Sequence, residues 1–315
     1  MARVRGKNST NVRANLVRFG VGVAQGISTD LAGRVAEELF VTPMRGPRPE
    51  RERGWLATAE RIPLSVDGQE LAAWAWGDRD DPPVLLVHGW AGRGAQLGAL
   101  APPLLDLGFR VIAFDAPAHG SSPGRRLTLV AQARAVAAAA EAVGGRLEGV
   151  VAHSFGAAAV TLAMARGLRV ERVAFLAPVV RVEDAVRRFV RWARLAEDAE
   201  AGFRRRLAQR AGATVAEVDA IRLAEAMTTP LLVVHDEDDR EVPTDEGRAI
   251  AGRWPGAAFH ATNGLGHHHI LRDPDVVFSV CRWLASGVVP RPVTEELERE
   301  LFIPALRLAG GPQRS

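Results

Sequence analysis

The strongest constraint on the fold is a regular alternation of short apolar runs and helical patterns that begins near residue 61. Residues 84–87, Val-Leu-Leu-Val, have the continuous apolar character of a parallel strand buried on both faces. Other strand-like segments are residues 61–66, 71–76, 110–114, 150–153, 173–176, 231–234 and 257–262. Helical patterns occupy residues 95–107, 127–143, 155–166, 244–254 and 274–284. The alternation predicts an α/β fold with a mostly parallel, doubly wound sheet covered by helices on both faces.

The alternation stops between residues 181 and 227, where helical pattern continues without a strand. We expect this segment to be a helical cap inserted between the two parts of the α/β core, residues 54–180 and 228–287. Residues 1–53 are expected to form an N-terminal helical extension and a linker, because residues 43–53 are rich in Pro, Arg and Glu. Residues 288–315 are expected to be a C-terminal tail.

The N-terminal extension carries an apolar stripe at helical spacing. It predicts one amphipathic helix, or two helices separated near residues 26–30. The stripe is formed by Leu16, Val23, Ile27, Leu31, Val35 and Leu39. We expect it to pack on the main body, as most amphipathic helices of soluble chains do. The alternative is contact with a membrane surface or with a partner helix.

Composition narrows the classes of function. The net charge is +3, Lys7 is the only lysine, and no basic face with interleaved aromatic residues is evident, so nucleic-acid binding is not expected. Cys281 is the only cysteine, which excludes an intrachain disulfide and a cysteine metal site, and we expect it to be a small buried side chain. Residues 19–29 are too short to span a bilayer, and no clear signal-peptide cleavage site precedes them. A cytoplasmic location is therefore expected.

Ser154 stands between the expected strand 150–153 and the helix that follows it. Ala152 and Gly156 are small residues two positions before and after it, as a tight strand-to-helix turn requires. Ligands of parallel sheets bind beyond the carboxyl ends of the strands, which is where this turn would lie. The start of the next helix would also offer backbone N–H groups to a developing anion.

Residues 152–156 resemble the nucleophile elbow of the α/β-hydrolase family, Gly-x-Ser-x-Gly, with Ala152 in place of the first glycine. The resemblance extends over residues 61–287. It implies that Ser154 is a nucleophile and that an acid and a histidine follow in that order along the chain.

The acid has three candidates in residues 230–243, a segment that resembles the strand end carrying the acid in this family. These candidates are Asp236, Asp238 and Asp239. The family's spacing, an acid three residues before the Val of Val-Pro, selects Asp239, and Asp238 is the alternative.

The histidine is expected in residues 263–271, which resemble the family's histidine loop. In that loop the histidine follows Gly-x-Gly, which selects His267. Neighbouring side chains diverge, so the three consecutive histidines do not suggest a metal site, and we expect His268 and His269 to be structural or surface residues.

The resemblance also implies an oxyanion hole formed by two backbone N–H groups. One belongs to Phe155, directly after the nucleophile. The other belongs to Trp90, because residues 85–94 match the family's loop with His-Gly, in which His88 and Gly89 set the loop geometry. Residues 114–122 match a structural turn of the family, so Asp115 and His119 are not expected to be catalytic. No cofactor or metal is expected.

The resemblance thus implies a serine hydrolase, carboxylesterase-like, that acts on a small-molecule ester or related acyl compound. Thioesterase, acyltransferase, lactonase and C–C hydrolase activities are alternatives with the same triad, and a non-catalytic ligand-binding protein on this fold is another. Haloalkane dehalogenases and epoxide hydrolases use Asp as nucleophile and are disfavoured by Ser154. The cap is rich in arginine, which predicts solvated helix faces or, alternatively, steering of an anionic substrate. These are Arg181, Arg187, Arg188, Arg191, Arg194, Arg204, Arg205, Arg206 and Arg210.

Overall fold

The computed structural model describes residues 18–286 and divides into two compact units. The smaller comprises the chain up to Thr42 together with Val182–Glu217, and the larger comprises Pro43–Arg181 and the chain from Val218 onward. The expected tail, 288–315, and residues 1–17 with Leu16 lie outside the described residues. The boundaries differ from the expected ones because residues 43–53 pack into the larger unit, as does the helix α9 (Ala220–Ala224).

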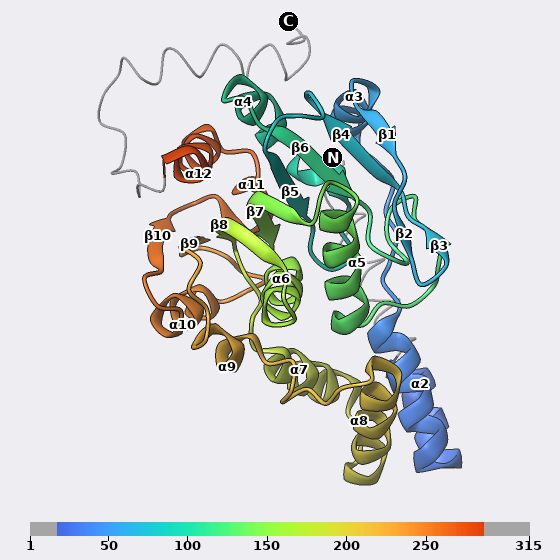
Figure 1. The fold of residues 1–315 in the computed structure, drawn as a ribbon. Helices are drawn as coiled ribbons and strands as arrows, with labels where there is room; N and C mark the ends of the chain where they lie inside the picture. Colours follow the sequence, from blue (N-terminus) through green and yellow to red (C-terminus); the bar gives the residue numbers. More distant parts are fainter. Residues whose placement is uncertain (1–17, 287–315) are drawn as a thin grey trace, which may run out of the picture. The chain divides into compact units, whose positions relative to one another are not determined.

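The larger unit is built on a sheet of eight described strands, and Figure 1 shows it flanked by helices. In spatial order they are β1 (Glu60–Ile62), β4 (Ala73–Trp76), β6 (Arg110–Phe114), β5 (Pro83–Val87), β7 (Arg146–His153), β8 (Arg169–Leu176), β9 (Leu231–Asp236) and β10 (Ala258–Thr262). The pairs β1–β4 and β4–β6 are antiparallel, and all other neighbouring pairs are parallel. The expected α/β architecture with a mostly parallel sheet is confirmed.

The strand prediction 61–66 corresponds to two short strands, whereas the prediction 71–76 contains one strand, residues 73–76, and a further short strand precedes it at residues 69–70. Residues 67 and 68 form the predicted turn, and both have the positive φ of a tight hairpin, 51° at Asp67 and 76° at Gly68. This turn joins β2 (Ser65–Val66) to β3 (Gln69–Glu70), which pair only with each other. The flanking β1 and β4 enter the main sheet instead.

Helices cover both faces of the sheet because side chains alternate along each strand. Val84 and Leu86 of β5 belong to one apolar cluster with the 3₁₀-helix η1 (Gly94–Leu100), α4 (Ala101–Asp106) and α12 (Pro274–Ser286). The buried Cys281, as expected, is part of it. The other layer contains α5 (Leu129–Glu141), α6 (Phe155–Ala165), α9 and α10 (Asp245–Arg253).

The smaller unit consists of helical residues 18–27, α2 (Thr29–Val41), α7 (Val182–Ala193) and α8 (Glu197–Ala211). Ser28 separates the first two helices, and its Oγ accepts a hydrogen bond from Leu31 N at 3.4 Å, so the two-helix alternative is confirmed. The expected packing of the apolar stripe is wrong for Val23 and Ile27, which are 47% and 72% exposed. Contact of this stripe with a membrane surface or a partner stays a prediction.

Small residues allow α2 to approach α8 closely. Ala32 and Ala36 are fully buried there. Gly33 approaches α8 so closely that a Cβ atom on it would lie 2.9 Å from the backbone nitrogen of Phe203. Close approach of two helices requires small side chains at the contact, and Leu31 and Val35 of the stripe pack beside these small residues.

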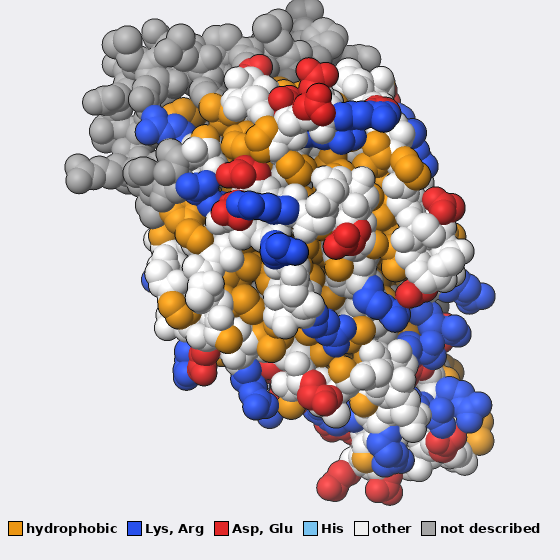
Figure 2. Space-filling model, viewed as in Figure 1, with side chains coloured by type: hydrophobic (Ala, Val, Ile, Leu, Met, Phe, Trp, Pro, Cys, Tyr) orange, Lys and Arg blue, Asp and Glu red, His pale blue; other side chains and the backbone are white. Residues whose placement is uncertain are grey.

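Arginines of the inserted helices form ion pairs within the smaller unit. Arg204 of α8 contacts the carboxylates of Glu183 on α7 and of Glu200 on α8. Arg206 and Arg210 reach Asp30 and Glu37 of α2, as Arg187 reaches Glu183. In Figure 2, basic and acidic side chains lie among one another over the helices α2 and α8. These pairs favour a structural role for these four arginines over substrate steering.

Within residues 18–286, no helix combines the length and the apolar character that crossing a bilayer would require.

Candidate active site

Ser154 occupies a strained turn between β7 and α6. Its backbone has φ 54° and ψ −125°, a region that non-glycine residues adopt only when their surroundings compel them, at a cost of about 1–3 kcal/mol. Hydrogen bonds from Ser154 N to Leu176 O, and from Ala157 N and Val179 N to Ser154 O, each 3.0 Å, hold this conformation. The turn places the side chain at the carboxyl end of the sheet.

Two glycines give this turn the space it needs. A Cβ atom on Gly156 would lie 2.8 Å from His88 O and 2.9 Å from Val87 O. A Cβ atom on Gly89 would lie 2.7 Å from the Cβ of Ser154. The small residues around Ser154 therefore reflect close approach of the elbow to the loop that follows β5.

The three expected side chains lie in one hydrogen-bonded chain. The distance from Ser154 Oγ to His267 Nε2 is 3.1 Å, and that from His267 Nδ1 to Asp239 Oδ2 is 2.7 Å. Ser154 and His267 are 7% and 8% exposed, and the Asp239 side chain is fully buried. Of the three competing carboxylates, Asp239 alone contacts the imidazole of His267 in the described structure.

Asp239 is held as an anion, which can accept a hydrogen bond from a ring N–H of His267. Burial alone would raise its pKa, but hydrogen bonds from His235, His267 and the Val242 backbone N–H outweigh burial and hold the pKa of Asp239 well below its usual range. Its Oδ1 accepts from Glu241 N at 2.8 Å and from Val242 N at 2.9 Å. An ionised Asp239 keeps the proton of His267 on Nδ1 and leaves Nε2 free to accept from Ser154.

Trp90 and Phe155, the expected oxyanion residues, lie next to each other. Phe155 is the first residue of α6, where a backbone N–H has no acceptor within the helix. Trp90 lies in the loop after β5, and its ring packs edge-on against the Phe155 ring, with centroids 5.8 Å apart and planes at 86°. Two donors facing the same side of Ser154 would form a site for an oxyanion.

Buried histidines hold the loop that carries Trp90. His119 Nε2 accepts from Ala91 N at 3.0 Å, and His88 Nε2 accepts from Ala116 N at 2.9 Å. Both rings must be neutral at Nε2 to accept. Burial lowers the pKa of His88 to about 4 and that of His119 to about 3, so both accept hydrogen bonds near neutral pH.

Stability is therefore expected to fall when the pH is lowered from 7 to 5. Below pH 6.5 the unfolded chain protonates both histidines, whereas the folded chain keeps His88 and His119 neutral down to about pH 4 and about pH 3. The unfolded state binds more protons in this window, so the free energy of unfolding decreases by up to roughly 2 kcal/mol per histidine between pH 6.5 and 5. Urea unfolding followed by tryptophan fluorescence measures this loss. His119→Gln should make it smaller, and an equal loss in both proteins would contradict the assignment.

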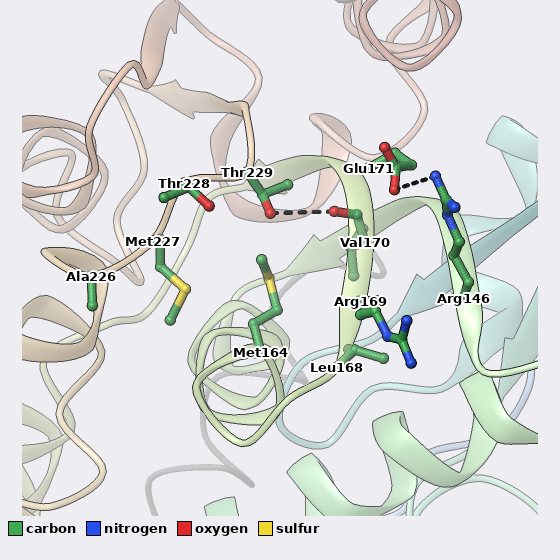
Figure 3. Close-up of a pocket in the computed structure, with 10 residues that line it drawn as sticks. All are labelled: Arg146, Met164, Leu168, Arg169, Val170, Glu171, Ala226, Met227, Thr228 and Thr229. Atoms are coloured by element: carbon green, nitrogen blue, oxygen red, sulfur yellow. Dashed lines mark hydrogen bonds and ion pairs between the residues drawn. The ribbon is translucent and has the colours of Figure 1, made fainter.

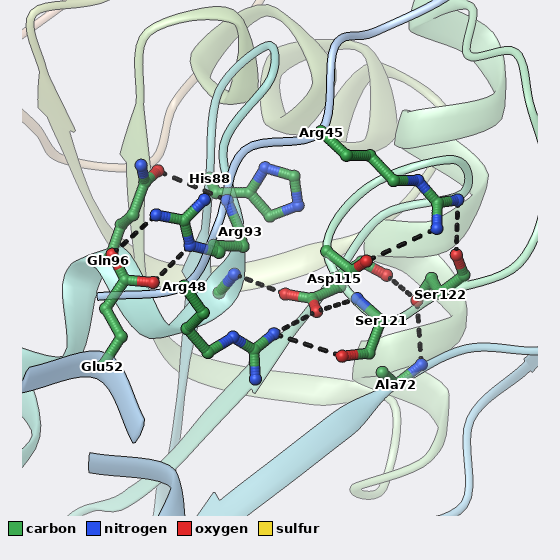
Figure 4. Close-up of polar contacts among 12 residues, drawn as sticks. Arg45, Arg48, Glu52, Ala72, His88, Arg93, Gln96, Asp115, Ser121 and Ser122 are labelled. Carbon is green, nitrogen blue, oxygen red and sulfur yellow. Dashed lines mark hydrogen bonds and ion pairs between the residues drawn. The ribbon is translucent and has the colours of Figure 1, made fainter. Parts of the chain in front are cut away.

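Asp115 ties this loop region together, consistent with the structural role expected of it. Its Oδ1 accepts from Gly94 N at 2.9 Å, and its Oδ2 accepts from Ser121 N at 2.8 Å and from the Arg48 guanidinium at 3.0 Å (Figure 4). Burial raises the pKa of Asp115, while these N–H groups act in the opposite direction.

Residues 43–53, which composition suggested to be a linker, instead bind the core. Arg45 donates to the backbone oxygens of Ala118, Ser122 and Gly124 at 2.9, 2.8 and 3.0 Å (Figure 4). The helix α3 (Glu50–Ala57) contributes Glu52, which pairs with Arg93. A Pro- and Arg-rich composition could not reveal this, because the acceptors are backbone oxygens of a distant loop.

A cavity of about 410 Å³ lies elsewhere in the larger unit. Arg146 and Arg169, at the amino ends of β7 and β8, line it together with Met164 and Met227 (Figure 3). Ser154 follows the carboxyl end of β7, so this cavity lies at the opposite ends of the strands from Ser154. Within residues 18–286, no group of three or more His, Cys, Asp and Glu side chains is placed to hold a metal ion.

Comparison with known proteins decides the family. The model of the Alpha/beta hydrolase family matches residues 84–280, more than half of the chain. This chain belongs to the alpha/beta hydrolase family. The resemblance noted in the sequence is thereby confirmed, and the matched range contains the elbow, the acid loop and the histidine loop.

Relatives of this alpha/beta hydrolase include a human serine hydrolase-like protein, 34% identical over 102 residues. The match covers 30% of this chain and 48% of that protein, so it spans less than half of the relative. Solved structures with the same fold include an esterase from Thermogutta terrifontis, with 21% identity and a TM-score of 0.53 over 72% of this chain and 97% of the other. A monoacylglycerol lipase from Paleococcus ferrophilus has 20% identity and a TM-score of 0.55 over 70% and 100%.

Two buried histidines near the Ser154–His267–Asp239 chain make contacts that the sequence did not predict. His153 lies beside Ser154, and its Nε2 donates to the backbone oxygen of His267 at 3.0 Å. Burial lowers the pKa of His153 well below its usual range, so the ring is a neutral donor. His235 also contacts Asp239, with its Nε2 3.5 Å from Oδ2, the oxygen that His267 contacts. The histidines could be seen in the sequence, but their partners lie 114 and 4 residues away and depend on the fold.

Proposed function

We propose that this alpha/beta hydrolase cleaves a small-molecule ester or related acyl compound through an acyl-enzyme at Ser154. The observation that carries the proposal is the chain of hydrogen bonds from Ser154 Oγ through His267 to Asp239. A serine hydroxyl is a weak nucleophile near neutral pH, and a neutral imidazole within 3.1 Å can take its proton as it attacks a carbonyl. The family and the named relatives favour hydrolysis as the reaction class.

The proposed reaction has two halves. In the first, Ser154 Oγ attacks the acyl carbon while His267 Nε2 takes its proton, and the N–H groups of Trp90 and Phe155 bind the oxyanion. His267 then donates the proton to the leaving group, which departs and leaves the acyl group on Ser154. In the second, water attacks the acyl carbon while His267 takes its proton; the bond to Ser154 Oγ then breaks, the acyl group leaves as an acid, and His267 returns the proton to Oγ. Asp239 stabilises the imidazolium in both halves.

The acyl group would lie against the indole of Trp90. This residue is 38% exposed and lies in the loop next to Ser154. This apolar wall supports an acyl compound with a hydrophobic portion as substrate. Thioester hydrolysis, acyl transfer, lactone opening and C–C hydrolysis use the same three side chains and remain alternative reactions. A ligand-binding protein without catalysis is the alternative from another class.

The proposal is tested by reaction with a fluorophosphonate probe, which phosphonylates an activated serine. We expect the folded protein to become labelled, the adduct to map to Ser154 by mass spectrometry, and Ser154→Ala to remain unlabelled. Ser122→Ala is the matched control, since Ser122 is also buried but its hydroxyl bonds to Asp115 O and Ala72 N, not to His267, so this change should not alter the labelling site. A folded protein that resists the probe would favour the binding protein. A panel of p-nitrophenyl esters and acyl-thioesters of graded chain length then identifies the acyl group.

A further inference from the structure

Asp236 has a different environment from the other acids of its loop. It ends β9, has no exposed surface, and both of its carboxylate oxygens accept two hydrogen bonds. Oδ2 accepts from Thr262 Oγ1 at 2.8 Å and from Leu265 N at 3.0 Å. Oδ1 accepts from Gly266 N at 2.9 Å and from Asp238 N at 3.1 Å. A buried carboxylate that accepts two hydrogen bonds at each oxygen is held in one orientation.

Two of these donors belong to the backbone directly before His267. Gly264 and Gly266 have positive φ, 78° and 62°, so this segment uses conformations that glycine adopts freely, and Leu265 between them is the only one of these three residues with a side chain to pack on the apolar cluster. The segment therefore needs an external contact to become rigid. Asp236 supplies it at Leu265 N and Gly266 N, and Asp238 adds a contact to Gly264 N at 3.0 Å.

We propose that Asp236 is a positioning residue, whose carboxylate fixes the 264–266 backbone so that the His267 imidazole reaches Asp239 and Ser154 together. A second contact comes from His153, whose Nε2 donates a hydrogen bond to the backbone oxygen of His267 at 3.0 Å. The histidine is thus fixed from its N-terminal side by an anion and at its own carbonyl by a neutral ring. Hydrogen bonds outweigh burial and lower the pKa of Asp236, so this anion persists at acidic pH. This inference rests on the proposed function for its kinetic consequence only.

Asp236→Asn is the informative variant because an amide keeps the shape and loses one acceptor. Each Asp236 oxygen now accepts hydrogen bonds from two donors. In either orientation of the amide, the NH₂ group of Asn would face two of these donors, and that contact would be repulsive. We expect kcat to fall by roughly 10²-fold, since a displacement of about 1 Å at a reacting group has this effect, while KM changes less than about twofold. Glu237→Gln is the matched control: it removes the same charge one residue away, where the side chain is exposed and pairs with Arg248.

A second measurement does not depend on activity. The Nδ1 proton shared by His267 and Asp239 should give a downfield proton NMR resonance in the unmodified protein, absent in His267→Ala. We expect it to persist in Glu237→Gln and to disappear or broaden in Asp236→Asn. If Asp236→Asn does not fold, Thr262→Val removes a single donor and should lower kcat in the same direction by a few-fold.

The outcomes separate the two proposals. If the wild-type protein reacts with the probe, but Asp236→Asn retains the kcat and the resonance of Glu237→Gln, the positioning role is overturned and the hydrolase mechanism stands. If the wild-type protein does not react with the probe, the proposed function is overturned, and the resonance alone still decides whether Asp236 orients His267. Loss of the resonance in Asp236→Asn with an unchanged Glu237→Gln supports the positioning role in either case.

Discussion

Replacing Asp239 by Asn is expected to lower kcat for ester hydrolysis by about 10⁴-fold, with a folded protein and an intact Ser154. The reason lies in the hydrogen bonds that fix the orientation of this side chain. Oδ1 accepts from the backbone N–H groups of Glu241 and Val242, so an Asn at this position must place its oxygen there. Its NH₂ group then occupies the place of Oδ2 and donates to His267 Nδ1.

That single change reverses the role of the imidazole. With Nδ1 accepting, the proton of neutral His267 lies on Nε2, which faces Ser154 Oγ at 3.1 Å and can no longer take its proton. Stopped-flow or steady-state kinetics with the best p-nitrophenyl ester measure kcat. Glu241→Gln is the control, because Glu241 is exposed and contacts His268 rather than His267. A loss below about tenfold in Asp239→Asn, or an equal loss in Glu241→Gln, would show that another residue orients the histidine.

The parallel strands were predictable because burial on both faces imposes a continuous apolar run. Residues 110–114 were predicted at the bounds of β6. The predictions for β7 and β8 covered only their carboxyl-terminal halves, and those for β5, β9 and β10 were within two residues of the observed bounds. Elements lacking that signal were less well predicted. The helix expected at 95–107 begins as the 3₁₀-helix η1, and α4 follows with prolines in its first turn, where a missing N–H costs little.

The residues expected at the site could be selected because three segments resemble motifs of the family, whose spacing points to Ser154, Asp239 and His267. Each segment follows a strand, and parallel strands bring their carboxyl ends to the same side of the sheet. Contacts that depend on precise placement could not be predicted this way. Asp236 was only one of three competing acids until its partners at Thr262, Leu265 and Gly266 were visible. Arg45 likewise looked like part of a linker, since its acceptors are backbone oxygens some 70 residues away.

Removing the carboxylate of Glu52 is expected to destabilise the larger unit by about 3–5 kcal/mol. Glu52 lies on α3 and is 1% exposed, and its carboxylate accepts from Arg93 Nε and, at 3.1 Å, from Arg93 Nη2 (Figure 4). The Arg93 side chain is 11% exposed. Glu52→Ala would leave this guanidinium buried without its partner, and the uncompensated charge determines the loss. Urea unfolding followed by tryptophan fluorescence measures it.

The size of this loss comes from leaving the buried Arg93 charge without a partner, rather than from the attraction between Arg93 and Glu52. A double variant distinguishes these two causes. Replacing both partners with apolar side chains of similar volume, Glu52→Leu with Arg93→Met, removes the buried charges together and should recover most of the stability lost in Glu52→Ala. The exposed pair Arg53–Glu50 on the same helix is the control, and Glu50→Ala should cost less than about 1 kcal/mol. A double variant no more stable than Glu52→Ala would mean that α3 depends on the ion pair itself for docking.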